Sequence, residues 1–394
     1  MDGTSTTTEP LALHALEYMV RRFTGRMTKA EWAGLDPIAD YPHVIGNSNV
    51  RHTEFLLERY RNDLKESALA GAFIEALAWT LACMEDSTRR RTIWHDAKQC
   101  GLGDLLKDAD FQQLFKGGDI DDANVASRIE PFVRKHGMWF HCSHSGPLTA
   151  AALDIYYMRY HAILRAIEQG RGATLSRELL SMSDRRLIEP MPGYDLFVPL
   201  VKGWLDPRQD DLFAWLAQQP DLATTPEQLA RLAQRFREHP AKLALVTASI
   251  RYEAETTMRE VMSIVAERVK AWPMPEIERD ELARRVADVD AVFDAFICAA
   301  DACEHRLKPH PDLYCLALER MSIPKSDYRY CVGLEDTEPG IIALRAAGVG
   351  CAVALPNHDT NRQDYRAACL QVRGGLPDLI GQHNLLLQPE SNRT

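Results

Sequence analysis

Short apolar runs alternate with longer helical segments after Pro240, and this alternation restricts the fold more than any other feature of the chain. Each run is bounded by polar turn residues, as expected for a strand that is buried on both faces. Strands that alternate with helices in this way predict a parallel sheet with right-handed crossovers. We therefore expect an α/β fold here. The four runs are "AKLALVTAS", "FDAFICAAD", "YRYCVGLED" and "GCAVALP".

The chain between Leu11 and His239 has a different pattern, which is mostly helical. Apolar residues such as Leu16, Val20 and Phe23 recur at the spacing of one helix face. The segment "TTPEQLARLAQRFREHP" begins with a capping box and ends at a proline, and "GPLTAAALDIYYMRYHAILRAIEQG" reads as one long helix. We expect a helical half followed by an α/β half.

Composition excludes several classes of function. A formal net charge of −10 argues against a nucleic-acid-binding protein, which needs a clustered basic surface. Nine cysteines without a CxxC pair indicate free thiols in a reducing cytoplasm. The polar first residues do not resemble a signal peptide. The apolar stretch from Ser67 to Met84 contains Glu75 and is short for a membrane span, so we expect a buried helix and no membrane role.

Chemically useful residues follow the predicted strands at the edge where open parallel sheets bind ligands. Thr247 ends one strand, the pair Glu335 and Asp336 ends another, and Lys308 precedes a Pro-His-Pro turn that opens a helix. Taken singly, they could be a strand-end cap, a helix N-cap and a solvated lysine. Together, a hydroxyl, an ammonium and two carboxylates indicate a site for a phosphate group and Mg²⁺.

These motifs resemble those of the haloacid dehalogenase (HAD) superfamily, in the branch that contains β-phosphoglucomutase and phosphonatase. The most specific match is "KPHPDLYCLALERMSIPKSDYRYCVGLEDTEPGIIALRAAGVGCAVALP", which carries Lys-Pro-x-Pro-Asp, a strand ending in Glu-Asp-Thr, and then Gly-Ile and Ala-Ala-Gly. The segment "LALVTAS" is similar to the second motif of the family, and "MDGTSTTTEPL" to the end of its first. The resemblance covers residues 1–20 and 240–380.

The resemblance implies a role for each matching residue. Thr247 and the amide of Ala248 would bind the transferring phosphoryl group, and Lys308 would neutralise its oxygens. Asp336, assisted by Glu335, would hold Mg²⁺.

Asp2 matches the second aspartate of the family's Asp-x-Asp motif, so the resemblance makes it the general acid and base and places its backbone carbonyl on the metal. The nucleophilic aspartate would then precede Met1, together with the central first strand of the sheet. Asp2 could itself be the nucleophile, but Thr4 would then hold the acid–base position, which a hydroxyl cannot fill near neutral pH. Asp119 and Asp121 form another Asp-x-Asp, but they read as a polar loop with a helix cap. We favour a start codon placed too late, or a truncated gene copy, over a purposeful pseudoenzyme.

The resemblance further implies a helical cap that closes over the site and selects the substrate. Residues 11–239 occupy its place and are far more numerous than in a usual cap, with residues 1–10 and 240–394 as the core. Asn47, in "GNSNVRH", is a candidate substrate contact because smaller caps place a glycine-containing loop there. His141, Cys142 and His144 could bind zinc, but a helix-entry loop with polar caps is favoured.

The sequence thus predicts a HAD-like Rossmannoid core with a large inserted helical cap. The function that follows is a Mg²⁺-dependent phosphatase of a small phosphorylated metabolite, inactive or impaired as numbered. The alternatives are a non-catalytic phosphate- or metabolite-binding protein and a phosphomutase.

Overall fold

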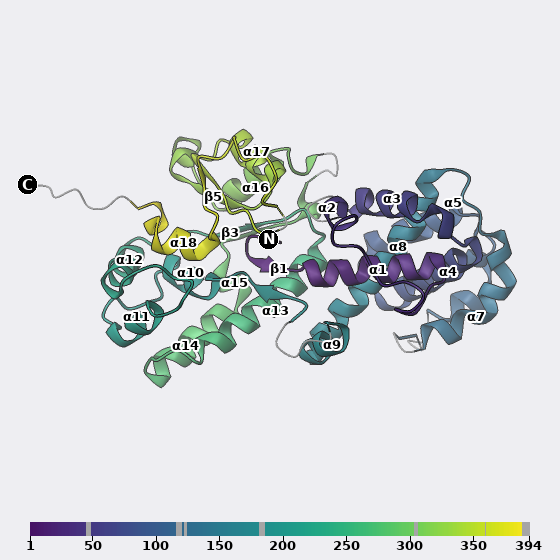
Figure 1. The fold of residues 1–394 in the computed structure, drawn as a ribbon, viewed down its shortest axis with the longest axis horizontal. Coiled ribbons are helices and arrows are strands. Elements are labelled where there is room, and N and C mark those ends of the chain that lie inside the picture. The colour runs from purple at the N-terminus through teal and green to yellow at the C-terminus, as the bar shows by residue number, and fades with distance from the viewer. Residues whose placement is uncertain are drawn as a thin grey trace, which may run out of the picture. The chain divides into compact units, whose positions relative to one another are not determined.

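The computed structural model describes residues 1–44, 49–115, 120–121, 124–180, 186–302, 306–358 and 360–387. The chain divides into two compact units (Figure 1). Unit 1 comprises Met1–Thr8 and Arg186–Thr394, and unit 2 comprises Glu9–Arg185. The contacts therefore group residues 186–239 with the strands, whereas the predicted cap extends to residue 239; the cap boundaries remain a prediction.

Unit 1 contains all the described strands and is mixed α/β, in agreement with the predicted fold class. Its strands are β1 (Thr6–Thr7), β2 (Glu189–Pro190), β3 (Ala244–Val246), β4 (Ala295–Ile297), β5 (Val332–Glu335), β6 (Cys351–Ala354) and β7 (Leu370–Gln371). Its helices are α10 (Tyr194–Val201), α11 (Asp210–Leu216), α12 (Pro226–Glu238), α13 (Arg251–Val269), α14 (Glu276–Ala287), α15 (Val289–Val292), α16 (Asp312–Arg320), α17 (Glu338–Ala346) and α18 (Gly375–Gly381).

The parallel strands form two separate small sheets, β3-β4 and β5-β6-β7. Leu245 pairs with Phe296 in the first sheet, and Leu334 pairs with Val353 in the second. A third sheet joins β1 to β2 in antiparallel register, with Thr6 opposite Pro190. The predicted parallel pairing is therefore present, but the described strands form two parallel sheets and not the single sheet that was expected. Among these strands β3 and β5 each lie at the edge of a sheet.

Apolar residues of both parallel sheets and of the helices α16 and α17 make one core. Val246, Ile297, Leu313 and Ile341 are buried in it. Burying each such side chain stabilises the fold by about 1.5–3 kcal/mol. β5 departs from the predicted full burial, because Val332 at its start is 50% exposed whereas Ala352, Val353 and Ala354 of β6 are buried. This difference places the incompletely covered part of the sheet at the free edge of β5.

Unit 2 is helical throughout its longer described elements. Its helices are α1 (Glu9–Thr24), α2 (Tyr41–Val44), α3 (Asn49–Arg59), α4 (Glu66–Cys83), α5 (Ser87–Gln99), α6 (Ala109–Gln113), α7 (Val125–His136), α8 (Ser145–Ala166) and α9 (Gly172–Leu180). The helices α1, α4 and α8 contact one another, and the apolar α4 also contacts α5 and α7.

The apolar stretch of the sequence coincides with α4. Among the described helices it alone is long and apolar enough to cross a membrane, by length and composition only. Of its apolar window, 67% is buried inside the structure, and the core helix of a soluble protein meets the same criterion.

Candidate active site

The segment Met1–Thr8 contacts the residues that follow both β3 and β5. The Asp2 carboxylate accepts a hydrogen bond from Ser249, two residues beyond Thr247, at 3.4 Å. Thr4 donates to Asp336 at 3.0 Å between Oγ1 and Oδ1. One short segment therefore connects the carboxyl ends of two strands that belong to different sheets.

Gly3 permits this close approach. Its φ is +68°, a left-handed conformation that favours glycine. A Cβ atom at Gly3 would lie 1.9 Å from Oδ2 of Asp336 and 2.7 Å from Nδ2 of Asn357. The glycine in the Asp-Gly-Thr sequence is therefore explained by the lack of space beside Asp336, in addition to the chemistry of the flanking Asp2 and Thr4.

Thr247 is buried at the end of β3 and belongs to a chain of hydroxyls that leads to Asp2. Its Oγ1 donates to Oγ of Ser249 at 3.1 Å, and its Oγ1 also accepts from the Ser249 amide at 3.1 Å. The other carboxylate oxygen of Asp2 accepts from Thr8 at 2.7 Å. Ala248, between Thr247 and Ser249, is exposed. These hydrogen bonds fix the orientation of the Asp2 carboxylate and of the Thr247 hydroxyl, which lie close to each other.

Glu335 and Lys308 form a buried ion pair, with Glu335 3% exposed. Tyr314 donates its hydroxyl to the same carboxylate oxygen, and Thr337 donates to the other at 3.1 Å. Burial raises the pKa of Glu335, but the ammonium of Lys308 and the hydrogen bonds from Lys308 and Tyr314, among other contributions, together outweigh it and hold the pKa at about 2. Lys308 is therefore neutralised by protein in this structure, and a ligand that binds it must compete with Glu335.

Asp336 has the opposite electrostatic character. Burial and the neighbouring Glu335 charge raise its pKa to about 7. Its carboxylate accepts from Asn357 at 3.3 Å as well as from Thr4, and its backbone carbonyl accepts from Tyr365. A buried carboxyl with a raised pKa is a candidate functional group, because a cation beside it would stabilise the charged form.

These residues fit Mg²⁺ only as a partial ligand set. Among the residues that the structure describes, no group of three or more histidine, cysteine or acidic side chains is arranged to hold a metal. Mg²⁺ is commonly bound through one or two carboxylates, with water and substrate phosphate completing the octahedron. Asp336 can supply one carboxylate, while Glu335 is occupied by Lys308, and the resemblance assigns only the backbone carbonyl of Asp2 to the metal.

Three sequence predictions remain, and the structure describes the residues of one of them. Asn47 falls outside the described residues, as does Asp119 of the alternative Asp-x-Asp. In the His141–His144 loop, His144 is the N-cap of α8, and its ring accepts from the Gly146 amide at 3.3 Å. That loop is therefore the helix entry that the sequence favoured.

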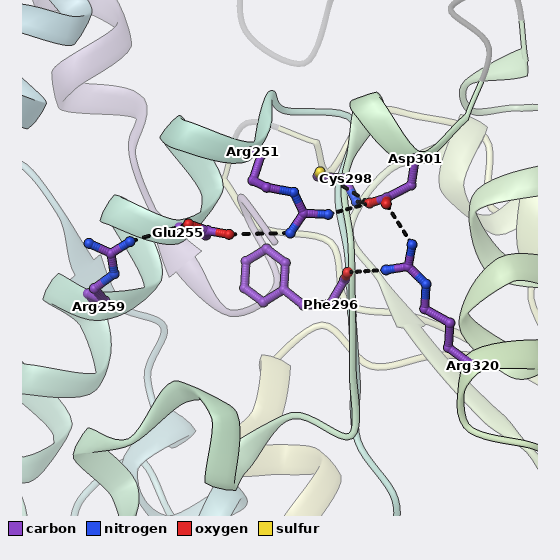
Figure 2. Close-up of polar contacts among 7 residues, drawn as sticks. All are labelled: Arg251, Glu255, Arg259, Phe296, Cys298, Asp301 and Arg320. Atoms are coloured by element: carbon purple, nitrogen blue, oxygen red, sulfur yellow. Dashed lines mark hydrogen bonds and ion pairs between the residues drawn. The ribbon is translucent and has the colours of Figure 1, made fainter. Parts of the chain in front are cut away.

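An ion-pair network holds the loops that follow β3 and β4 (Figure 2). Asp301 accepts from Arg251 at 2.8 Å, from Arg320 at 2.6 Å and from the Cys298 amide at 2.9 Å. Burial raises the pKa of Asp301, but these donors outweigh it and lower the pKa. Arg320 also donates to the Phe296 carbonyl in β4 at 3.1 Å. The network fixes the sheet edge on which Thr247 lies.

Sequence reasoning missed the residues that position the charged groups: Thr4, Thr8, Ser249, Tyr314, Asn357 and Tyr365. Ser249 and Thr8 had a weak signal, since hydroxyl residues cluster beside both motifs. Asn357, Tyr314 and Tyr365 had none, because their contacts with Asp336 and Glu335 exist only in the folded chain.

Comparison with known proteins gave limited results. No protein-family model matches the chain, and no curated protein matches it. Two solved structures of CbbY from Rhodobacter sphaeroides are similar, each with a TM-score of 0.34. The one in complex with phosphate is 16% identical and matches 81% of this chain and 92% of its own. A mutant in complex with xylulose-(1,5)bisphosphate is 18% identical, with 80% and 91% covered. At these values the likeness does not establish a family.

Proposed function

We propose that unit 1 binds a small phosphorylated molecule with Mg²⁺ at the carboxyl ends of β3 and β5, as HAD-type phosphatases do. The observation that carries the proposal is that the segment Met1–Thr8 contacts Ser249 beside Thr247 and also contacts Asp336, whose neighbour Glu335 pairs with Lys308. Hydroxyl, ammonium and carboxylate groups gathered at the carboxyl ends of these strands are what a phosphate and a divalent cation require.

One set of residues binds the phosphate anion, and another set binds the metal cation. The hydroxyl of Thr247, the amide of Ala248 and the ammonium of Lys308 bind the phosphoryl oxygens. The Asp336 carboxylate and the backbone carbonyl of Asp2 would hold Mg²⁺, which would supply positive charge beside the transferring group, and the Asp2 carboxylate is left for proton transfer. Glu335 holds Lys308 in the absence of ligand and assists the metal once phosphate takes over the ammonium.

Hydrolysis additionally needs a nucleophilic carboxylate, and we propose that it comes on a strand between β3 and β5. Both strands have a free edge among the described strands, and both line one cavity of about 520 Å³. The cavity is lined mostly by apolar side chains, including Val246, Leu334 and Leu376. A parallel strand there would pair with both edges and bury its side chains.

The HAD resemblance puts an aspartate at the end of that strand, directly ahead of Met1. That carboxylate would attack phosphorus in line to form an aspartyl-phosphate. Asp2 would protonate the leaving alcohol, and water would then release phosphate.

A non-catalytic binding protein is the second candidate, and the Lys308–Glu335 pair favours it. Glu335 already neutralises the ammonium of Lys308. The residues Asp2, Thr247, Lys308 and Asp336 suffice to bind a phosphate group and a metal ion without hydrolysing a phosphate ester. The two candidates share the phosphate site and differ in whether a nucleophile reaches it.

Calorimetric titration with inorganic phosphate in the presence of Mg²⁺ tests the shared site. Removing one hydrogen bond to an anion costs roughly 1.5–3 kcal/mol, so Thr247→Val should weaken binding by about tenfold or more. Thr257→Val is a matched control, because Thr257 is buried on α13 and its hydroxyl has no partner. Equal affinity in Thr247→Val and Thr257→Val, or no binding by the parent chain, would overturn the proposal.

Aryl phosphate turnover separates the two candidates. The chain as numbered is compared with one extended at Met1 by an apolar strand ending in aspartate. Losing a covalent nucleophile costs on the order of a millionfold in rate, so the extended chain alone should turn over, and Asp336→Asn should abolish its activity. Turnover by the unextended chain that depends on Asp336 would show that the nucleophile lies within it.

A further inference from the structure

Two cysteine thiols of unit 2 lie next to each other. The Sγ atoms of Cys100 and Cys142 are 3.7 Å apart, although 42 positions separate the residues. Both thiols are free. Sulfurs at this distance are in van der Waals contact, and a disulfide would shorten the separation to about 2 Å.

The backbone beneath the two thiols is already joined. Cys100 caps the C-terminus of α5, and its carbonyl accepts a hydrogen bond from the His141 amide at 3.0 Å. Gly101 lies against the same loop, since a Cβ there would be 2.4 Å from the Trp139 carbonyl oxygen. The two chain segments therefore approach each other closely without any covalent link, and closing the sulfurs requires mainly side-chain rotation.

The two thiols differ in a way that assigns their roles. Cys100 is buried and also donates to the Pro147 carbonyl at 3.6 Å, whereas Cys142 is half-exposed. Contact with Cys100 lowers the pKa of the Cys142 thiol, while the same contact and burial raise the pKa of Cys100. A half-exposed, more acidic thiol beside a buried one is the arrangement of an attacking and a resolving cysteine.

We propose that Cys100 and Cys142 are a redox modification site that forms a reversible disulfide on exposure to a peroxide. The Cys142 thiolate attacks one peroxide oxygen, the O–O bond breaks, and a sulfenic acid and one water result after proton transfer. The sulfur of Cys100 then attacks the sulfenic sulfur, and the S–S bond forms as a second water leaves. Two thiols are oxidised and one peroxide is reduced to two waters. A dithiol reductant reverses the modification.

The disulfide would join the C-terminus of α5 to the loop that enters α8. Cross-linking two segments that far apart in sequence restricts the unfolded chain, so the oxidised form should be harder to unfold. Oxidation would therefore stiffen unit 2 without changing its contacts. This inference does not depend on the proposed phosphate site.

The test treats the full chain with hydrogen peroxide, alkylates remaining thiols and maps the peptides by mass spectrometry. We expect one cross-linked peptide joining Cys100 to Cys142, lighter by two hydrogen atoms, that disappears after reduction. The oxidised chain should unfold at a temperature several degrees higher. Cys142→Ser should lose both the cross-link and the shift.

Cys83→Ser is the matched control, because Cys83 is in the same unit and is also half-exposed, and its thiol donates to the Ile120 carbonyl at 3.4 Å. That variant should keep the cross-link and the shift. Because mapping the parent chain needs no variant, a folding defect in Cys142→Ser leaves the test intact. Recovery of both cysteines as over-oxidised acids, or a cross-link only between other cysteines, would overturn the proposal.

Discussion

Gly3 is the residue on which the geometry of the candidate site depends most directly. Gly3→Ala would impose a left-handed φ on alanine and place its Cβ against the Asp336 carboxylate. We expect a loss of about 2–4 kcal/mol in the free energy of unfolding, with weaker phosphate binding in Mg²⁺, both measured against the parent chain.

Gly348→Ala is the control for this substitution. Gly348 has a similar φ of +84°, but the nearest atom to its added Cβ is 3.6 Å away, on Tyr328. It should cost about 1 kcal/mol for conformation alone and leave binding unchanged. If the two variants lose equal stability, the close approach to Asp336 contributes nothing to the cost of the Gly3→Ala substitution.

His14 of α1 gives unit 2 a pH-dependent stability. Burial, Arg159 and Arg21 lower the pKa of His14 from 6.5 to about 4, and Arg159 donates to its Nε2 at 3.0 Å. The unfolded chain therefore binds a proton more readily, and stability falls as the pH drops from 6.5 toward 4. The loss is about 2–3 kcal/mol after allowance for partial exposure, at 1.36 kcal/mol per pKa unit.

Denaturant titrations between pH 7.5 and about 4 measure this effect. Glutamine accepts a hydrogen bond at every pH, so His14→Gln should flatten the dependence while the other titrating groups stay the same. Parallel stability curves for the two proteins would exclude His14 as the cause.

At the scale of elements, α5 and α8 are joined by the buried ion pair of Arg89 and Asp154. One oxygen of Asp154 has no partner, and burial raises the pKa of Asp154 to about 6 despite the opposing Arg89. Arg89→Met should destabilise the chain by about 3–5 kcal/mol, because it leaves a buried carboxylate unpaired. Combining it with Asp154→Leu should recover most of that loss, as measured by denaturant unfolding.

The exposed pair of Arg134 and Glu130 on α7 is the comparison. Arg134→Met should cost less than about 1 kcal/mol, since water screens the exposed charges. A loss at Arg89 as small as that at Arg134 would contradict the account of the buried pair.

Elements with strong local signals were predictable from the sequence. Thr225 caps α12 and accepts from the Gln228 amide, as its capping motif indicated, and the strands β3 to β6 lie in the four apolar runs. The two-residue strands β1, β2 and β7 were not predicted, because so short a strand has no periodicity and depends on its partner. The long helix before Gly170 also ends earlier than expected, since Ile167–Arg171 forms a separate wider turn.

At the scale of the whole molecule, the sequence predicted which strand ends carry functional groups but not how those groups are paired. Thr247, Lys308 and Asp336 were predicted as phosphate and metal ligands from residue type, position and the family resemblance, and these roles stay predictions. That Lys308 pairs with Glu335, and that Asp336 has a raised pKa, depends on burial and on contacts across 27 or more positions. Such contacts form only after the sheets assemble.

The division into two units yields a prediction about independent folding. β1 pairs with β2, and Met191 donates to the Ser5 carbonyl at 3.0 Å, so the two ends of unit 1 at Thr8 and Arg186 are tied together. Replacing residues 9–185 by a short Gly-Ser linker would turn this pair into a hairpin, whose loops are commonly about 2–5 residues long. We expect a soluble chain with a cooperative thermal transition that still binds phosphate.

A second deletion, of residues 11–239, tests the domain boundary predicted from the sequence. It removes α10 and α12 from unit 1, and with them buried residues such as Leu196, Leu200 and Leu229. Losing several buried leucines at about 2–5 kcal/mol each exceeds the stability of an ordinary domain, so this chain should not fold. If circular dichroism and thermal unfolding instead show that the larger deletion folds and the smaller one does not, the boundary lies at residue 239 and the contact division is wrong.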